Sequence, residues 1–116
     1  MKPLLWVGSS KKDLLAMPGE VQDIFGFALH QAQDGGKHPQ AKPLKGFSGA
    51  GVLEVVEDYD GDTYRAVYTV KFEGAIYALH CFQKKSTKGV ETPKHDLDLI
   101  KSRLQSAREH MEGLNT

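Results

Sequence analysis

Two predicted strands carry the side chains best suited to chemistry on a phosphodiester. The first strand holds Arg65, and the second holds His80, Phe82 and Lys84 at alternate positions. If Glu73-Gly74 is the two-residue turn between the strands, Arg65 lies opposite Phe82. Because side chains alternate along a strand, these four residues share one face of the sheet. The pattern therefore predicts a face with two cations, an imidazole and an aromatic ring.

A carboxylate joins this face from the preceding strand. Asp60-Gly61 is a strong hairpin dipeptide. Pairing the strands about that turn places Glu54 opposite Val67, and so on the face of Arg65. A slip of one residue would turn every side chain of the strand to the other face. With this register, Glu54 is a candidate for proton transfer or for pairing with Arg65.

This set of side chains suits cleavage of RNA by the neighbouring 2′-hydroxyl. His80 or Glu54 could accept the proton of that hydroxyl. Arg65 and either Lys84 or Lys85 could stabilise the extra negative charge of the phosphorane-like transition state. A histidine or a lysine could then protonate the leaving 5′-oxygen. Side-chain cations supply the positive charge in this scheme, so we expect neither a metal nor another cofactor.

Three further residues are candidates for holding RNA. Phe82 could stack on a base, which is worth roughly 1–3 kcal/mol. Lys45 lies in segment 37–51, whose glycines and prolines predict a loop, and Lys88 ends a run of three lysines without an acid. Lysines in such places could contact phosphates.

Each candidate residue also has a structural interpretation. Arg65 could be a strand arginine paired to Glu54, and His80 could be a partly buried histidine with its ring nitrogens satisfied. Phe82 is more often a core residue than a stacking platform. The lysines could be solvated charges that discourage pairing at a sheet edge.

The elements that would position these residues form an α+β fold of the order β-α-α-β-β-β-α. Segments 3–7, 52–56, 63–71 and 75–83 are predicted strands of a small antiparallel sheet. A short helix is expected after a capping box at Ser10–Asp13, and its end at Pro18. A second helix covers 20–33, and a third starts at Thr92-Pro93, with Thr92 as its N-cap, and stops at Gly113.

The opposite face of the sheet is apolar in this register and is expected to pack against helices on that one face. Its residues are Tyr64, Ala66, Tyr68, Val70, Tyr77, Leu79 and Cys81.

Length and composition restrict the classes of protein. The chain has 116 residues, a mass of 12.8 kDa and 40% hydrophobic residues, which predicts one globular domain over 1–116. Its 15 basic and 15 acidic residues give no general electrostatic footprint for nucleic acid. The lone Cys81 excludes an internal disulfide and a cysteine-rich zinc site, and the scattered histidines make no metal pattern. The longest N-terminal apolar run, Leu4 to Val7, is far too short to span a membrane. Because the chain has a single cysteine, a reducing cytoplasm is the expected location.

Several segments together resemble the phage-derived, HigB-like branch of the RelE/ParE toxin superfamily. They are GAGVLEV at 49–55, DTYRAVY at 62–68 and LHCFQKKS at 79–86, followed by Thr92-Pro93 and a helix. The similarity covers most of the chain in the right order and spacing.

This resemblance implies a RelE-like fold and the toxin of a type II toxin–antitoxin pair. RelE- and HigB-like members cut mRNA, typically on the ribosome. The products expected here from attack by the 2′-hydroxyl are a 2′,3′-cyclic phosphate and a 5′-hydroxyl. The partner would be an antitoxin, often a helix-turn-helix protein. The family's arginine falls on Arg65, its basic pair on Lys84 and Lys85, its strand glutamate on Glu54 and its strand histidine on His80.

Two other functions are compatible with the resemblance, because a shared fold does not fix activity. ParE-like relatives inhibit gyrase without being enzymes. A phage-derived module could also bind an antitoxin-like partner without catalysis. Cleavage of mRNA, DNA damage without cleavage, or a stable complex without toxicity would distinguish the three.

Overall fold

The computed structural model describes residues 1–47, 49–84 and 92–114. These residues form five strands and three helices, which confirms the α+β class. In chain order they are β1 (Leu4–Trp6), α1 (Ser10–Leu15), α2 (Gly19–Gln33), β2 (Ala41–Pro43), β3 (Val52–Tyr59), β4 (Asp62–Thr69), β5 (Ile76–Lys84) and α3 (Lys94–Leu114). No helix in the described ranges is long and apolar enough to cross a membrane.

The strands form one sheet in the order β1-β5-β4-β3-β2. The predicted hairpin between β3 and β4 is confirmed, since Asp60 and Gly61 have φ angles of 51° and 85°. Positive φ at both central residues is the requirement of a tight two-residue hairpin turn. The predicted register is confirmed as well, with Glu54 opposite Val67 and Val56 opposite Arg65.

The observed β4–β5 register differs from the predicted one because β5 contains a β-bulge. Val67 pairs with His80 as expected, but Tyr68 pairs with Ala78 and Thr69 with Tyr77. The extra residue is Leu79, and it moves the preceding part of β5 by one position. The turn is also longer than two residues, because β4 ends at Thr69 and β5 begins at residue 76.

Because of the bulge, two residues lie on the other face of the sheet from the one predicted. Tyr77 and Leu79 were expected on the face opposite Arg65, but they pack with the residues of α3 on the same face as Val67. The other residues of the apolar list, Tyr64, Ala66, Tyr68, Val70 and Cys81, do pack against the side of α2.

The sheet differs from the predicted one in the direction of one strand and in the presence of another. β1 pairs in parallel with β5, so the sheet is mixed. β2 lies inside the segment predicted as a loop and pairs with β3. This strand is three residues long and at the edge of the sheet, where Pro43 is tolerated, so the composition of the segment concealed it.

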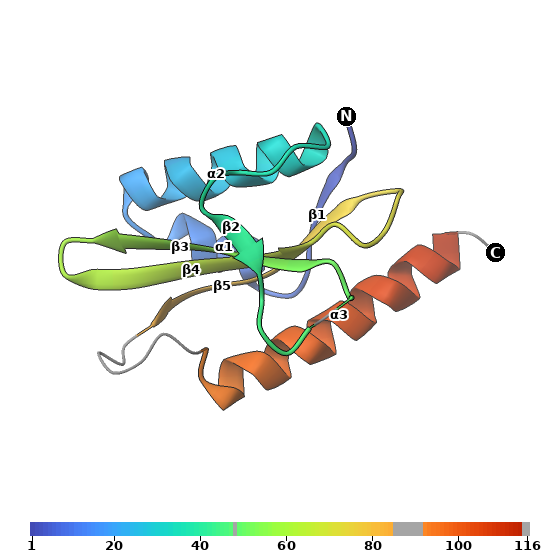
Figure 1. The fold of residues 1–116 in the computed structure, drawn as a ribbon. Helices are drawn as coiled ribbons and strands as arrows, with labels where there is room; N and C mark the ends of the chain where they lie inside the picture. The colour runs from blue at the N-terminus through green and yellow to red at the C-terminus, as the bar shows by residue number, and fades with distance from the viewer. Residues whose placement is uncertain (48, 85–91, 115–116) are drawn as a thin grey trace.

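Helices cover both faces of the sheet instead of one. α2 lies over one face and α3 crosses the other (Figure 1). The face of Arg65 requires a cover because it also carries apolar residues of β3, β4 and β5. α3 provides that cover with an apolar stripe at helical spacing, Ile100, Leu104 and Ala107.

The predicted helix over 20–33 is confirmed as α2, while both predicted caps are wrong. Ser10 is buried in the first turn of α1, and its hydroxyl donates to the carbonyl oxygen of Ala78 at 3.1 Å. Thr92 directs its hydroxyl to Arg65 instead of the start of α3. In both cases a tertiary hydrogen bond displaces the local one.

Candidate functional site

Arg65 and Glu54 form a buried ion pair on the face of the sheet covered by α3. The Arg65 Nη1 atom lies 3.0 Å from the Glu54 Oε2 atom. Their side chains are only 5% and 7% exposed. β4 and β3 bring them together because Glu54 and Arg65 occupy same-face positions two residues apart along the ladder. The structure thus unites these two predicted site residues.

Thr92 is a further hydrogen-bond partner of the guanidinium. Arg65 Nη1 donates a second hydrogen bond, 3.0 Å long, to the Thr92 hydroxyl oxygen. Thr92 is 8% exposed and precedes α3. Sequence reasoning assigned it only a capping role, and the signal that could have found it is its place beside Pro93 in the motif that carries the resemblance.

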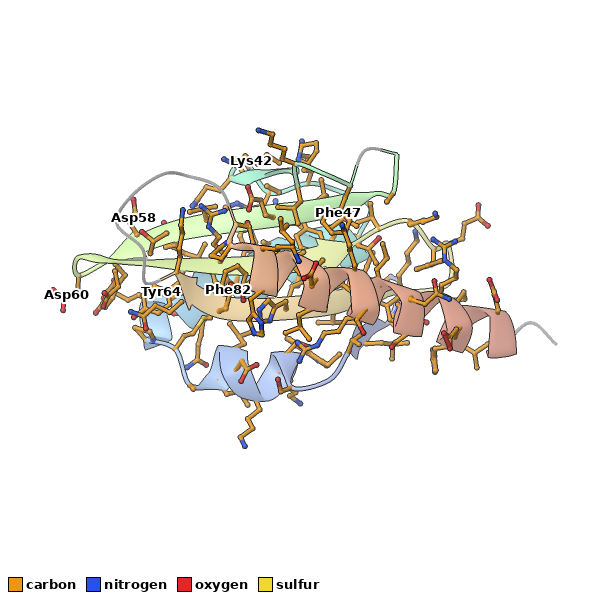
Figure 2. All side chains as sticks on the ribbon, turned by 90° about the horizontal axis from the view of Figure 1, so that it is seen from below. Lys42, Phe47, Asp58, Asp60, Tyr64 and Phe82 are labelled. Carbon is orange, nitrogen blue, oxygen red and sulfur yellow. The ribbon has the colours of Figure 1, made fainter. Side chains whose placement is uncertain are left out.

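Lys42, which the sequence suggested only as one of several loop lysines able to contact phosphates, also belongs to this site. It pairs with Glu54 in the β2–β3 ladder, and its Nζ atom lies 3.8 Å from Glu54 Oε1. Its side chain is 62% exposed. Figure 2 shows it on the β2 side of the sheet. Lys42 therefore brings a solvated ammonium next to a buried carboxylate.

These residues line a pocket of about 570 Å³ between β2, the two central strands and the start of α3. Its lining comprises Lys42, Pro43, Leu44, Lys45, Gly46, Glu54, Arg65, Thr92 and Leu97. Three cationic side chains and one carboxylate leave an excess of positive charge. Such a pocket is suited to an anion with an apolar portion, because apolar side chains line it as well.

His80 and Phe82 lie in a different place from this pocket. His80 Nε2 is 2.8 Å from Asp96 Oδ1 of α3, and its ring stacks on Phe82 with 4.4 Å between the centroids. Burial lowers the pKa of His80, although the hydrogen bond and charge of Asp96 oppose that shift. Both rings line a separate hollow of about 330 Å³ that also involves Asp13 and Tyr64.

The remaining predicted residues divide between the described and undescribed parts of the chain. Lys45 lines the pocket of Arg65. Lys84 is 7% exposed and pairs with Thr63 at the end of β5. Lys85 and Lys88 lie outside the described residues. Within the described ranges, no three histidine, cysteine, aspartate or glutamate side chains are grouped to hold a metal ion.

Comparison with known protein families identifies the family of this chain. The model of the family described as "Phage derived protein Gp49-like (DUF891)" matches residues 12–105, from α1 to well inside α3. This span includes every described residue of the pocket. No curated protein and no solved structure matches the chain.

Proposed function

The chain belongs to the phage-derived Gp49-like family, a toxin-like family of the RelE/HigB type, and we propose that it is a toxin that cleaves mRNA on the ribosome. A toxin family of this kind implies an antitoxin partner. We propose a type II system in which that partner is a helix-turn-helix protein.

The observation that supports cleavage best is the Arg65 pocket. Its guanidinium is buried and held by Glu54 and Thr92 before any substrate arrives. Lys42 and Lys45 add two cations to the same lining. Donors fixed in advance beside a low-dielectric wall stabilise developing negative charge more strongly than solvated donors do. The scissile phosphate of RNA is an anion of the right kind for this pocket.

In the proposed reaction, Glu54 accepts the proton of the ribose 2′-hydroxyl. The 2′-oxygen forms a bond to phosphorus, and the bond from phosphorus to the 5′-oxygen breaks. Arg65 stabilises the charge of the phosphorane-like transition state, and the Lys42 ammonium protonates the leaving oxygen. The products are a 2′,3′-cyclic phosphate and a 5′-hydroxyl.

The predicted histidine and the predicted basic pair have other roles in this scheme. His80 is bound to Asp96 outside the pocket, so the proton acceptor in the scheme is Glu54. Lys84 and Lys85 fall on the basic pair that the resemblance implies, and we propose that they contact RNA phosphates.

One observation favours a second function, an antitoxin-binding module without catalysis. α3 covers the face that carries Arg65 and Glu54, which are 4% and 6% exposed. A covered face restricts the approach of an RNA strand. The experiment below therefore has to distinguish cleavage from binding alone.

Induced expression of matched lysine variants tests the proposal. Lys42→Ala removes the pocket ammonium, and Lys101→Ala removes another exposed one from α3. Both side chains are exposed, so both variants should fold. Loss of a general acid lowers the rate by roughly 10²-fold or more, so Lys42→Ala should abolish the cleavage seen by primer extension on ribosome-bound transcripts. Lys101→Ala should cleave like the wild type.

The other outcomes are equally definite. Equal cleavage by both variants removes Lys42 from the mechanism. Intact mRNA and normal growth with folded, antitoxin-free wild type would favour the binding module. DNA damage with intact mRNA would instead indicate a gyrase inhibitor.

A further inference from the structure

The start of α3 is attached to the sheet at two points on neighbouring strands. On β4, Arg65 donates to the Thr92 hydroxyl at 3.0 Å. On β5, His80 Nε2 lies 2.8 Å from the Asp96 carboxylate. Thr92 and Asp96 are four residues apart, so the two attachments fix the same turn of the chain. Leu97, which follows Asp96, lines the Arg65 pocket.

The β-bulge supplies a third attachment further along the helix. Leu79 is the extra residue of β5, and its carbonyl oxygen accepts a hydrogen bond from Arg103 Nη1 at 2.9 Å. Arg103 Nη2 donates to the Ser9 hydroxyl at 3.1 Å. A side chain at Gly8 would come within 2.8 Å of Arg103 Nε, so the glycine leaves room for this guanidinium. α3 is therefore tied to both β5 and the segment before α1.

His80 lies at the centre of these contacts. It pairs with Val67 and lies on the α3 face, where its ring stacks on Phe82 at an interplanar angle of 15°. Its Nδ1 atom is 3.5 Å from Arg103 Nη1. The charged groups that act on it come from α3, Asp96 and Arg103, and from α1, Asp13. A ring held on this many sides is placed to fix a helix and not to reach a substrate in the Arg65 pocket.

We propose that His80, Asp96 and Arg103 form a clamp that positions the first turn of α3, and through it Thr92, against the guanidinium of Arg65. His80 is thus a positioning residue that acts through Asp96. As a statement about an active site the inference rests on the proposed function. The mechanical coupling between His80 and Arg65 does not depend on it.

The coupling predicts an effect at Arg65 when Asp96 is changed. Asp96→Ala removes the acceptor of His80, whereas Asp98→Ala removes a carboxylate of the same helix that pairs with Lys94 in solvent. Guanidinium protons of Arg65 in ¹⁵N NMR spectra of the full chain report its hydrogen bonds to Thr92 and Glu54. We expect Asp96→Ala to speed their hydrogen exchange about tenfold, the change that about 1.4 kcal/mol produces. Asp98→Ala should leave the exchange unchanged.

Two substitutions of His80 separate positioning from packing. The side-chain amide of His80→Gln can still donate to Asp96 and should keep the Arg65 signals of the wild type. His80→Leu cannot donate and should behave like Asp96→Ala. If His80→Leu does not fold, Asp96→Ala against Asp98→Ala decides the question alone.

The inference is overturned if folded Asp96→Ala leaves Arg65 exchange unchanged, or if Asp98→Ala alters it equally. Neither result bears on RNA cleavage, because the NMR measurement contains no RNA. Conversely, coupling in a wild type that fails to cleave mRNA would contradict only the proposed function.

Discussion

The buried pair of Arg65 and Glu54 makes a strong prediction about stability. Arg65→Met replaces the guanidinium with an apolar chain and leaves the Glu54 carboxylate buried without its partner. Breaking a buried pair in this way typically costs about 3–5 kcal/mol. No reduction for solvent screening applies, because the two side chains are 5% and 7% exposed. In this variant Lys42 offsets little of the lost stability, because an ion pair between Glu54 and a solvated lysine is worth about 0–1 kcal/mol.

A double substitution shows whether the loss comes from the unpaired charge. Glu54→Leu together with Arg65→Met replaces both partners with apolar groups of similar volume, which is often neutral for a buried pair. We expect the double variant to lie within about 1 kcal/mol of the wild type in free energy of unfolding. The single variant should lose several kcal/mol of a total that is about 5–15 kcal/mol for a domain.

Urea unfolding followed by the fluorescence of the single tryptophan, Trp6, measures these free energies. The wild type, both single variants and the double variant complete the cycle. A loss of less than about 1 kcal/mol in Arg65→Met would show that the unpaired Glu54 carboxylate costs little. A double variant as unstable as Arg65→Met would show that the loss does not come from the unpaired charge.

Three further predictions concern stability away from the pocket. Among the described residues the buried Tyr68 hydroxyl has no hydrogen-bond partner, so Tyr68→Phe should raise the free energy of unfolding by about 1 kcal/mol. A lower free energy of unfolding in urea would show that the hydroxyl has a partner. Gly8 has a φ of 57° and faces Arg103, so Gly8→Ala should lower the melting temperature. Gly19 has open space around it, so Gly19→Ala should not lower the melting temperature, and equal effects of the two substitutions would contradict this prediction. Burial holds the pKa of His80 below its usual 6.5, so the unfolded chain takes up this proton first as the pH falls. The resulting loss of stability from pH 6.5 downward should be smaller in His80→Gln, and an identical pH profile would rule out the histidine as its source.

Sequence reasoning could predict the parts of this fold that local physics decides. A two-residue hairpin turn requires positive φ angles, and Asp60-Gly61 is a dipeptide that adopts them. The position of this turn sets the β3–β4 register, which places Glu54 beside Arg65. The spacing of apolar residues over 20–33 similarly predicted α2, because its core face repeats at the helical period.

The parts it could not predict depend on contacts distant in sequence. The bulge at Leu79 has no local signature, since the extra carbonyl is satisfied by Arg103 from α3. The path of α3 across the Arg65 face likewise follows from apolar residues of several strands together. The sequence therefore left the Arg65 face uncovered, whereas α3 covers it in the structure. Glu54 and Arg65 line the pocket beside the start of α3, and His80 and Phe82 line a separate hollow.

The most direct test of the proposed function is the chemistry of RNA ends made by the purified protein on ribosome-bound mRNA. We expect a 2′,3′-cyclic phosphate and a 5′-hydroxyl with the wild type, and no cut with Lys42→Ala at the same protein concentration. Intact transcripts with folded wild-type protein, or cuts that carry a 5′-phosphate, would contradict it.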